Sequence, residues 1–331
     1  MKVTFLVGNG FDLNQNLKTS YADFYKVYAK PNKRDSKAVT DFKKHIEQSG
    51  LWSDLEVCLG YILREYKESE LDSYYEGLED LKKQLSVYLA NQEKRFKYKI
   101  SRIKREFVRA FYSYYLDSGY GHPFRDLYQE HSTSNEFSFI VFNYTEIINK
   151  MKDKLKRKKL SLNYKGIKNE IKDVLLIHGT AKKGFILGIN DEGQINNEKL
   201  KNVDSLQHYI IKSLQIDTMN QGYSRNDKKA SDIINDSDII YVYGMSIGST
   251  DKKYWELVNQ WLSAKSDHIL ILSHFDAKFN SISMGRIEEE NEKIKQKLRS
   301  FGFSDNIIST QVKMVTNSTL FSFKKRYHRY N

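Results

Sequence analysis

The sequence of 331 residues predicts a Rossmann-like α/β fold, doubly wound, with a mainly parallel sheet and a mainly helical insertion after the first strand-helix unit. Two observations carry this prediction. Continuous apolar runs recur along the chain, as in parallel strands that are covered on both faces. Residues 37–131, by contrast, show no strand pattern. We expect a single α/β domain over residues 1–331 that contains this insertion, because no Pro/Gly/Ser linker marks a boundary.

Five segments are predicted to be buried strands, because they are rich in β-branched, leucine and aromatic residues. They are residues 3–7, 137–142, 174–177, 239–243 and 269–272. Residues 185–187 and 311–315 are weaker strand candidates. Helical patterns over 251–263 and 286–300 follow later strands, and this alternation of strand and helix is typical of a doubly wound sheet.

The insertion contains one long amphipathic pattern. Apolar side chains recur at steps of three and four opposite a face of Lys and Arg, at Phe96, Ile100, Ile103, Phe107, Phe111 and Tyr114. This spacing predicts a long amphipathic helix with one buried stripe.

The net charge of +12 is concentrated in two segments. Residues 81–110 and residues 150–172 each carry ten Lys/Arg against two Asp/Glu, so the rest of the chain is slightly acidic. Concentrated positive charge can attract a phosphate backbone. No nucleic-acid motif accompanies it, so a solvated helix face and a lysine-rich loop are the favoured interpretation, with nucleic-acid binding as the alternative.

Composition also indicates the compartment. A single cysteine, Cys58, excludes a disulfide framework, and no apolar run approaches the length of about 18 residues that a membrane span needs. The apolar start of the chain is too short for a signal peptide. We expect a cytoplasmic protein that has no membrane partner.

The first predicted strand runs into Gly8-Asn9-Gly10-Phe11-Asp12. Two glycines after a strand allow a tight turn and a close approach to a pyrophosphate. The third glycine of the dinucleotide fingerprint is missing, because residue 13 is Leu. Ser20 and Asp23 form a predicted capping box that starts a helix about ten residues past the glycines. The loop is therefore expected to be longer than in ordinary dehydrogenases.

Three other predicted strands end in polar residues of similar kind. Asn143 follows the second strand, His178 the third, and Ser246 and Asp251 the fourth. Because the carboxyl ends of parallel strands meet at one edge of the sheet, we expect these residues to share one cleft with the glycine loop.

Taken together, these motifs resemble the bacteriophage abortive-infection AbiH family. The resemblance rests on GNGFD, TSYADF, LWSDLE, FNYT, IHG, LGIND and YGMSIGSTDKKYW, from residue 3 to about residue 256, and the final 70 or so residues add little. The order of the motifs is also similar to that of sirtuin-like NAD-binding domains, several of which hydrolyse NAD in other antiphage systems.

The resemblance implies an antiphage effector that binds NAD or a related nucleotide, hydrolyses its nicotinamide-ribose bond and needs no metal. It implies His178 as a general base that titrates near pH 7, with Asn143 beside the nicotinamide ribose. A phage trigger and a homo-oligomer are the other partners that it suggests. The residues implied at the nucleotide are Gly8, Asn9, Gly10, Phe11, Asp12, Thr145, Gly244, Ser246 and Asp251.

Asp12 departs from the sirtuin-like pattern, which has Ser or a small residue at this point. A carboxylate repels a pyrophosphate unless it caps amides, binds a ribose hydroxyl or meets a metal. The segment Leu51 to Glu56 raises a related question. We expect Trp52 and Leu55 in a helix core and Glu56 at the surface or behind the site, with acids at the pocket as the alternative.

Other chemistries stay open on the residues alone. Gly244 to Gly248 matches the G-x-S-x-G turn of serine hydrolases, and Asp276 and His328 follow in the right order, but the cap at Ser249 to Asp251 comes too late for that turn. A metal-dependent nuclease has only Glu170 and Lys172 in its favour. A non-catalytic nucleotide sensor, or a protein that binds RNA or a partner, is the runner-up.

Overall fold

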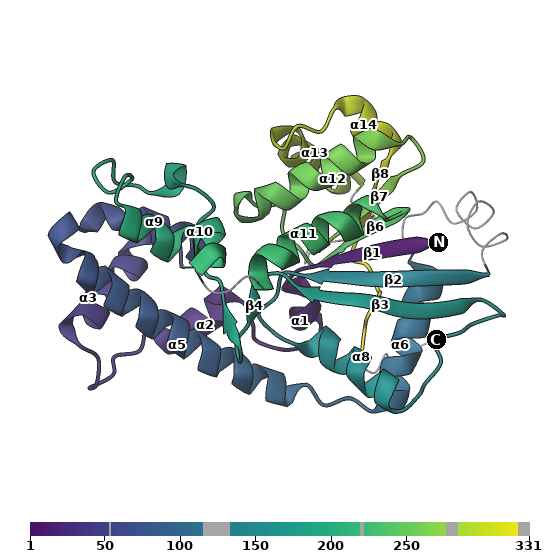
Figure 1. Cartoon of the computed structure of the whole chain (residues 1–331), viewed down its shortest axis with the longest axis horizontal. Helices are drawn as coiled ribbons and strands as arrows, with labels where there is room; N and C mark the ends of the chain where they lie inside the picture. Colours follow the sequence, from purple (N-terminus) through teal and green to yellow (C-terminus); the bar gives the residue numbers. More distant parts are fainter. Residues whose placement is uncertain (53, 115–132, 219–221, 276–283, 324–331) are drawn as a thin grey trace.

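The computed structural model describes residues 1–52, 54–114, 133–218, 222–275 and 284–323. Its centre is a six-stranded parallel sheet in the order β3-β2-β1-β6-β7-β8 (Figure 1). The chain builds outward from β1 to one edge and then from β6 to the other, so the switch point lies between β1 and β6. The strands are β1 (Lys2–Val7), β2 (Ser134–Val141), β3 (Lys168–Leu176), β6 (Ile239–Tyr243), β7 (Ile269–His274) and β8 (Val312–Thr316).

The predicted fold class and the five predicted strands are confirmed. The weaker candidate at 311–315 is β8. The candidate at 185–187 contributes to β5 (Gly184–Phe185), which pairs with β4 (Gly179–Thr180) in a small antiparallel hairpin outside the main sheet.

Both faces of the sheet are covered, which explains the continuous apolar strands. One face packs against α6 (Ile100–Ser113) and α8 (Ile147–Arg157), with a core of aromatic rings around Phe5. The other face packs against four helices, whose largest buried side chains are Trp255 and Trp261. These helices are α11 (Gly222–Asn235), α12 (Lys252–Ala264), α13 (Met284–Ser300) and α14 (Asp305–Thr310).

A helical lobe with its own core lies beyond the carboxyl ends of the strands (Figure 1). The described part of the predicted insertion is strand-free, as expected, but the lobe draws on more of the chain than that insertion. Its core also takes residues before 37 and residues between 185 and 211. The helices of the lobe are α2 (Tyr21–Tyr28), α3 (Lys37–Ser49), α4 (Leu55–Ile62), α5 (Leu71–Arg95), α9 (Asp204–Ile210) and α10 (Lys212–Thr218).

Two predicted helix starts need correction. The amphipathic helix predicted from Phe96 begins only at Ile100, because α5 ends at Arg95 and Phe96 caps it with a backbone hydrogen bond to Glu93. In the glycine loop, the short helix α1 (Gly10–Asn14) begins at once, so the loop is not the long one predicted. The predicted N-cap is confirmed, because Ser20 Oγ accepts a hydrogen bond from the Asp23 amide at 3.1 Å. The Asp23 carboxylate accepts from the Ser20 hydroxyl at 2.7 Å.

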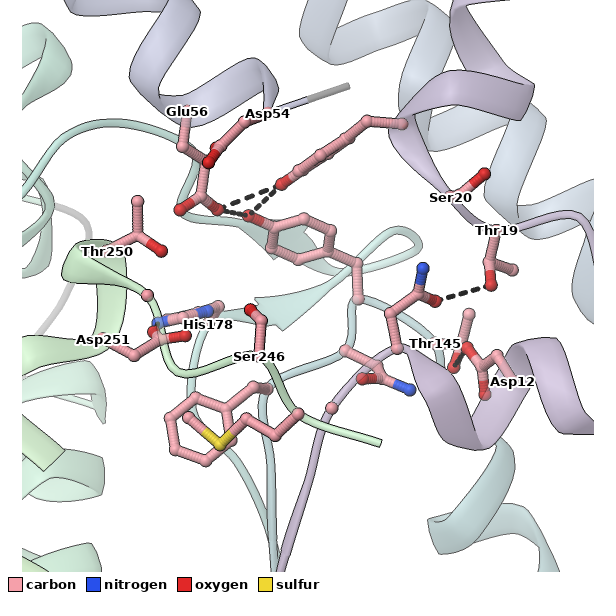
Figure 2. Close-up of a pocket in the computed structure, with 18 of the residues that line it drawn as sticks. Asp12, Thr19, Ser20, Asp54, Glu56, Thr145, His178, Ser246, Thr250 and Asp251 are labelled. Carbon is pink, nitrogen blue, oxygen red and sulfur yellow. Dashed lines mark hydrogen bonds and ion pairs between the residues drawn. The ribbon is translucent and has the colours of Figure 1, made fainter. Parts of the chain in front are cut away.

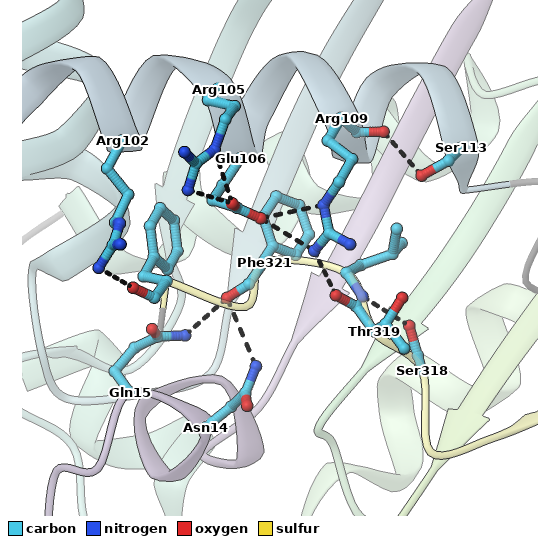
Figure 3. Close-up of polar contacts among 12 residues, drawn as sticks. Asn14, Gln15, Arg102, Arg105, Glu106, Arg109, Ser113, Ser318, Thr319 and Phe321 are labelled. Atoms are coloured by element: carbon cyan, nitrogen blue, oxygen red, sulfur yellow. Dashed lines mark hydrogen bonds and ion pairs between the residues drawn. The ribbon is translucent and has the colours of Figure 1, made fainter. Parts of the chain in front are cut away.

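Residues 317–323, here called the C-terminal strap, close one side of the core (Figure 3). Phe321 and Phe323 are fully buried. Arg102 of α6 donates to the Phe323 carbonyl at 2.9 Å, and Gln15, just after α1, donates to the Phe321 carbonyl at 2.9 Å. The end of the chain, which adds little to the sequence motifs, therefore holds α6 and α1 in place.

No helix in the described ranges combines the length and the apolar character that crossing a membrane would require.

Candidate functional site

A cavity of about 380 Å³ opens at the carboxyl ends of β1, β2, β3 and β6 and is closed on its other side by the helical lobe (Figure 2). This volume is typical of small-molecule sites, and its position at the switch point is where such sheets bind ligands. Eight of the eleven residues predicted for the site line it. They are His178, Asn143, Gly8, Asn9, Asp12, Thr145, Ser246 and Asp251.

Gly10, Phe11 and Gly244 are outside the lining, for a reason that the loop geometry gives. The Gly8 amide donates to the Tyr243 carbonyl at 3.0 Å, and the Gly10 amide donates to the Gly244 carbonyl at 2.7 Å. A Cβ at Gly10 would lie 2.5 Å from Gly244 Cα, and Gly244 has a φ of +61°. These glycines let the β1 and β6 loops touch, and the Gly8 and Gly10 amides are already bonded to protein.

The Gly8 and Gly10 amides are therefore not free to bind a ligand, and the placement of Gly8 and Gly10 at a pyrophosphate stays a prediction. Phe11 also has a packing role, because its ring is only 1% exposed and lies 5.7 Å from the ring of Phe321. Asn9 keeps its place at the cavity, where its Oδ1 accepts a hydrogen bond from Thr19 Oγ1 at 2.6 Å.

Asp12 lies on one side of the cavity and is almost fully buried. Thr145 Oγ1 donates to Asp12 Oδ2 at 2.7 Å, while Asp12 Oδ1 has no hydrogen-bond partner among the described residues. No cationic side chain of the described ranges forms an ion pair with it. Burial raises the pKa of Asp12 to about 7, while the Thr145 hydroxyl and the nearby Asn143 amide act in the opposite direction.

Glu56 lies on the opposite side of the cavity and is held by several partners (Figure 2). Lys212 Nζ lies 2.6 Å from Glu56 Oε2, and both side chains are buried. Tyr21 and Tyr144 donate to Glu56 Oε1 at 3.0 and 2.9 Å. Burial opposes ionisation of Glu56, but the charge of Lys212 outweighs it and the pKa of Glu56 falls below its usual value.

His178 and Asp251 meet beside this ion pair, with 3.7 Å between His178 Nε2 and Asp251 Oδ1. Burial and the charge of Lys212 lower the pKa of His178 to about 3, so the imidazole is neutral at pH 7. This lowered pKa argues against titration of His178 near pH 7, and its role as general base stays a prediction. Burial raises the pKa of Asp251 to about 6, although Lys212 opposes this shift.

The alternative for the segment Leu51 to Glu56, acids at the pocket, is the one that the structure shows, because Asp54 and Glu56 line the cavity. The sequence did not predict Lys212, Tyr21 or Tyr144 at the site. Glu56 did carry a signal, because it is the one charged residue in the apolar helix Leu-Glu-Val-Cys-Leu-Gly-Tyr-Ile of α4. A charge in such a helix needs a buried partner. Leu55 is buried as predicted, while Trp52 is only half-buried and stacks on Tyr25 at 5.7 Å.

A second cavity of about 280 Å³ shares His178, Thr250 and Asp251 with the first. Its lining includes Lys252 and Lys253, whereas the described residues that line the first cavity include no Lys or Arg. The second cavity therefore has lysine side chains in its lining that the described lining of the first cavity lacks, and the three shared residues separate the two.

The rival chemistries find less support in the geometry. Ser246 is exposed in a coil, and α12 begins only at Lys252, so the helix that a nucleophilic serine turn requires does not start at Ser246. Asp276 and His328 lie outside the described residues. Within the ranges that the structure describes, no group of three or more His, Cys, Asp or Glu is arranged to hold a metal ion.

The basic face of α6 is partly occupied by protein contacts. Arg105 and Arg109 form ion pairs with Glu106, and Arg102 and Arg109 donate to carbonyls of the C-terminal strap (Figure 3). These arginines therefore have structural partners, and nucleic-acid binding by this segment stays a prediction.

Comparison with known proteins agrees with the motifs that gather at the cavity. No curated protein matches the chain. A family model described as bacteriophage abortive infection AbiH matches residues 4–273, which include most of β1, all of β2, β3 and β6, and every predicted site residue. The chain therefore belongs to the AbiH family, which implies a role in abortive infection of phage-infected bacteria.

Proposed function

We propose that this protein is an antiphage effector whose strand-end cavity binds NAD, or a related nucleotide, and hydrolyses its nicotinamide-ribose bond. The observation that carries the proposal is the set of carboxyl groups that line the cavity, from Asp12, Asp54, Glu56 and Asp251. Positive charge develops on the ribose as this bond breaks, and carboxylates held around it would stabilise that charge. The oxidised nicotinamide ring is itself cationic, so the same carboxyl groups would attract it.

The polar groups of the cavity also suit a ribose. Asn143 Oδ1 is buried without a hydrogen-bond partner among the described residues, so it can accept a bond from a sugar hydroxyl. The phosphates would extend toward the second cavity. There Lys253 is exposed and pairs with Asp227 at 2.6 Å, and an exposed pair of this kind is weak enough to be exchanged for a phosphate.

Incubation of the purified protein with NAD tests the proposal directly. We expect release of free nicotinamide and ADP-ribose, measured by chromatography. Ser246→Ala should lose one hydrogen bond, of about 0.5–1.5 kcal/mol, and keep most of its activity. Ser249→Ala, a change in the same loop outside the first cavity, is the matched control. Labelling of Ser246 by a fluorophosphonate, with activity lost in Ser246→Ala, would favour a serine hydrolase instead.

A non-catalytic nucleotide sensor is the second candidate, and the surroundings of His178 favour it. An imidazole with a pKa of about 3 is a weak base at pH 7. Calorimetric titration with NAD separates the two functions, because a sensor would bind the nucleotide without any release of nicotinamide.

A further inference from the structure

Asp12 combines three features that bear on chemistry at this cavity. It lines the cavity, its side chain is almost fully buried, and only one of its two oxygens is bonded, to Thr145 at 2.7 Å. Burying a carboxyl group without a cation or a full set of hydrogen bonds is costly. Such a group at the wall of a cavity is a candidate for chemistry.

We infer that Asp12 is the proton acceptor of this site, with Thr145 as its positioning residue, an inference that rests on the proposed hydrolysis of NAD. A water oxygen forms a bond to C1′ of the ribose as the bond from C1′ to the nicotinamide nitrogen breaks. The electron pair of the broken bond stays with nicotinamide, which leaves as a neutral molecule. The proton of the water passes to Asp12 Oδ1 and is then released to solvent.

The other ionisable groups of the cavity are less suited to this step. Asp251 also has an oxygen without a hydrogen-bond partner, but it lies 3.7 Å from His178 and 4.0 Å from the ammonium group of Lys212, whereas Asp12 has no ion pair among the described residues. Glu56 is already engaged by Lys212, Tyr21 and Tyr144. His178 is neutral but a weak base, as described above. The pKa of Asp12, raised by burial to about 7, matches what a base needs at neutral pH.

Thr145 fixes which oxygen is free. Because its hydroxyl bonds to Oδ2, Oδ1 is the oxygen that has no hydrogen-bond partner among the described residues. Thr145 also lowers the pKa of Asp12, as does Asn143 from the same loop, while the charge of Glu93 from α5 raises it. Removing the hydroxyl should therefore raise the pKa of Asp12 without removing the base.

The test compares wild type, Asp12→Asn and Thr145→Val, with Asp72→Asn on an exposed face of α5 as the control. NAD turnover and NAD binding are measured separately. Asp12→Asn should lose turnover by about 10²- to 10⁴-fold while its dissociation constant for NAD changes by less than about threefold. Thr145→Val should lose turnover at pH 7 and regain it at higher pH, because the rising limb of its pH profile shifts upward. Asp72→Asn should match wild type.

The outcomes separate the two claims. An active wild type with an Asp12→Asn variant that keeps its turnover within about threefold would overturn the role of Asp12 alone. A wild type that releases no nicotinamide would overturn the proposed function and this inference with it. If Asp12→Asn fails to fold, the pH profile of Thr145→Val decides, and an unshifted limb would overturn the inference.

Discussion

The two sides of the cavity each bury a carboxyl group, but they shift its pKa in opposite directions. Glu56 is matched by the ammonium group of Lys212 and by two tyrosine hydroxyls, so it stays ionised. Asp12 has one hydroxyl donor at 2.7 Å and no ion pair within the described part of the chain, so its pKa rises. The contacts of Glu56 therefore stabilise the fold. The burial of Asp12 without a cation destabilises it, at a cost that folding does not require.

Replacing Glu56 should have the largest effect on stability. Glu56→Gln leaves the buried Lys212 without its closest counter-charge, so the free energy of unfolding should fall by about 3 kcal/mol at pH 7. Urea unfolding monitored by circular dichroism measures this. The pKa of Glu56 is lowered in the folded state, so its contribution is present above the unfolded value of 4.5 and is lost as pH falls below it.

A double variant provides the control for this prediction. If the loss comes from an isolated buried charge, Glu56→Gln combined with Lys212→Met should be more stable than Glu56→Gln alone. Additive losses would instead mean that the two side chains contribute independently, and the contrast between the two sides would weaken.

The Asp12 side depends on contact between two loops, which Gly10→Ala would disturb. The added Cβ would lie 2.5 Å from Gly244 Cα, so the β1 and β6 loops must separate and the free energy of unfolding should fall by about 1–3 kcal/mol. Thermal unfolding measures the change. Gly285→Ala, where φ is likewise not positive and nothing lies within 4 Å of an added Cβ, controls for the added methyl group alone. Equal losses in both variants would argue against loop contact.

Asp12→Asn should move stability in the opposite direction from Glu56→Gln. The pKa of Asp12 is about 7 when folded and 3.8 in the reference state, so wild type loses stability as pH rises between these values. We expect Asp12→Asn to gain about 1–2 kcal/mol at pH 8, because one pKa unit is worth about 1.4 kcal/mol and the new amide still has a buried unsatisfied group. Near pH 4 the gain should vanish.

Urea unfolding at both pH values measures this gain. If Asp12→Asn is instead less stable than wild type at pH 8, the Asp12 carboxylate has a stabilising partner in solution. Asp12 and Glu56 would then both stabilise the fold.

The smallest effect is expected outside the cavity. Lys97→Glu combined with Arg105→Glu reverses charge on the basic segment without removing the contact of Arg102 to the C-terminal strap. NAD binding should not change, and RNA or DNA binding at physiological salt should be weak in both proteins. If wild type binds RNA or DNA tightly and in a salt-sensitive way, and the variant does not, the ligand site would be assigned to this face and not to the cavity.

Local pattern was enough to predict the sheet and most of the cavity residues on the β side. The continuous apolar runs at β1, β2 and β6 could be recognised because parallel strands are buried on both faces. His178, Asn143 and Asp12 were found because the carboxyl ends of such strands share one edge. These inferences need only neighbouring residues and the geometry that every parallel sheet has.

Tertiary structure alone decided the other side of the cavity and the role of the glycines. Glu56 and Lys212 are 156 residues apart, and only the packing of the helical lobe brings them together. Gly10 packs against Gly244, 234 positions away, and its amide donates to the Gly244 carbonyl. Ion pairing and steric fit act through space over a few ångströms, so they depend on which distant segments the fold brings together. The local periodicity of the sequence does not specify which segments these are.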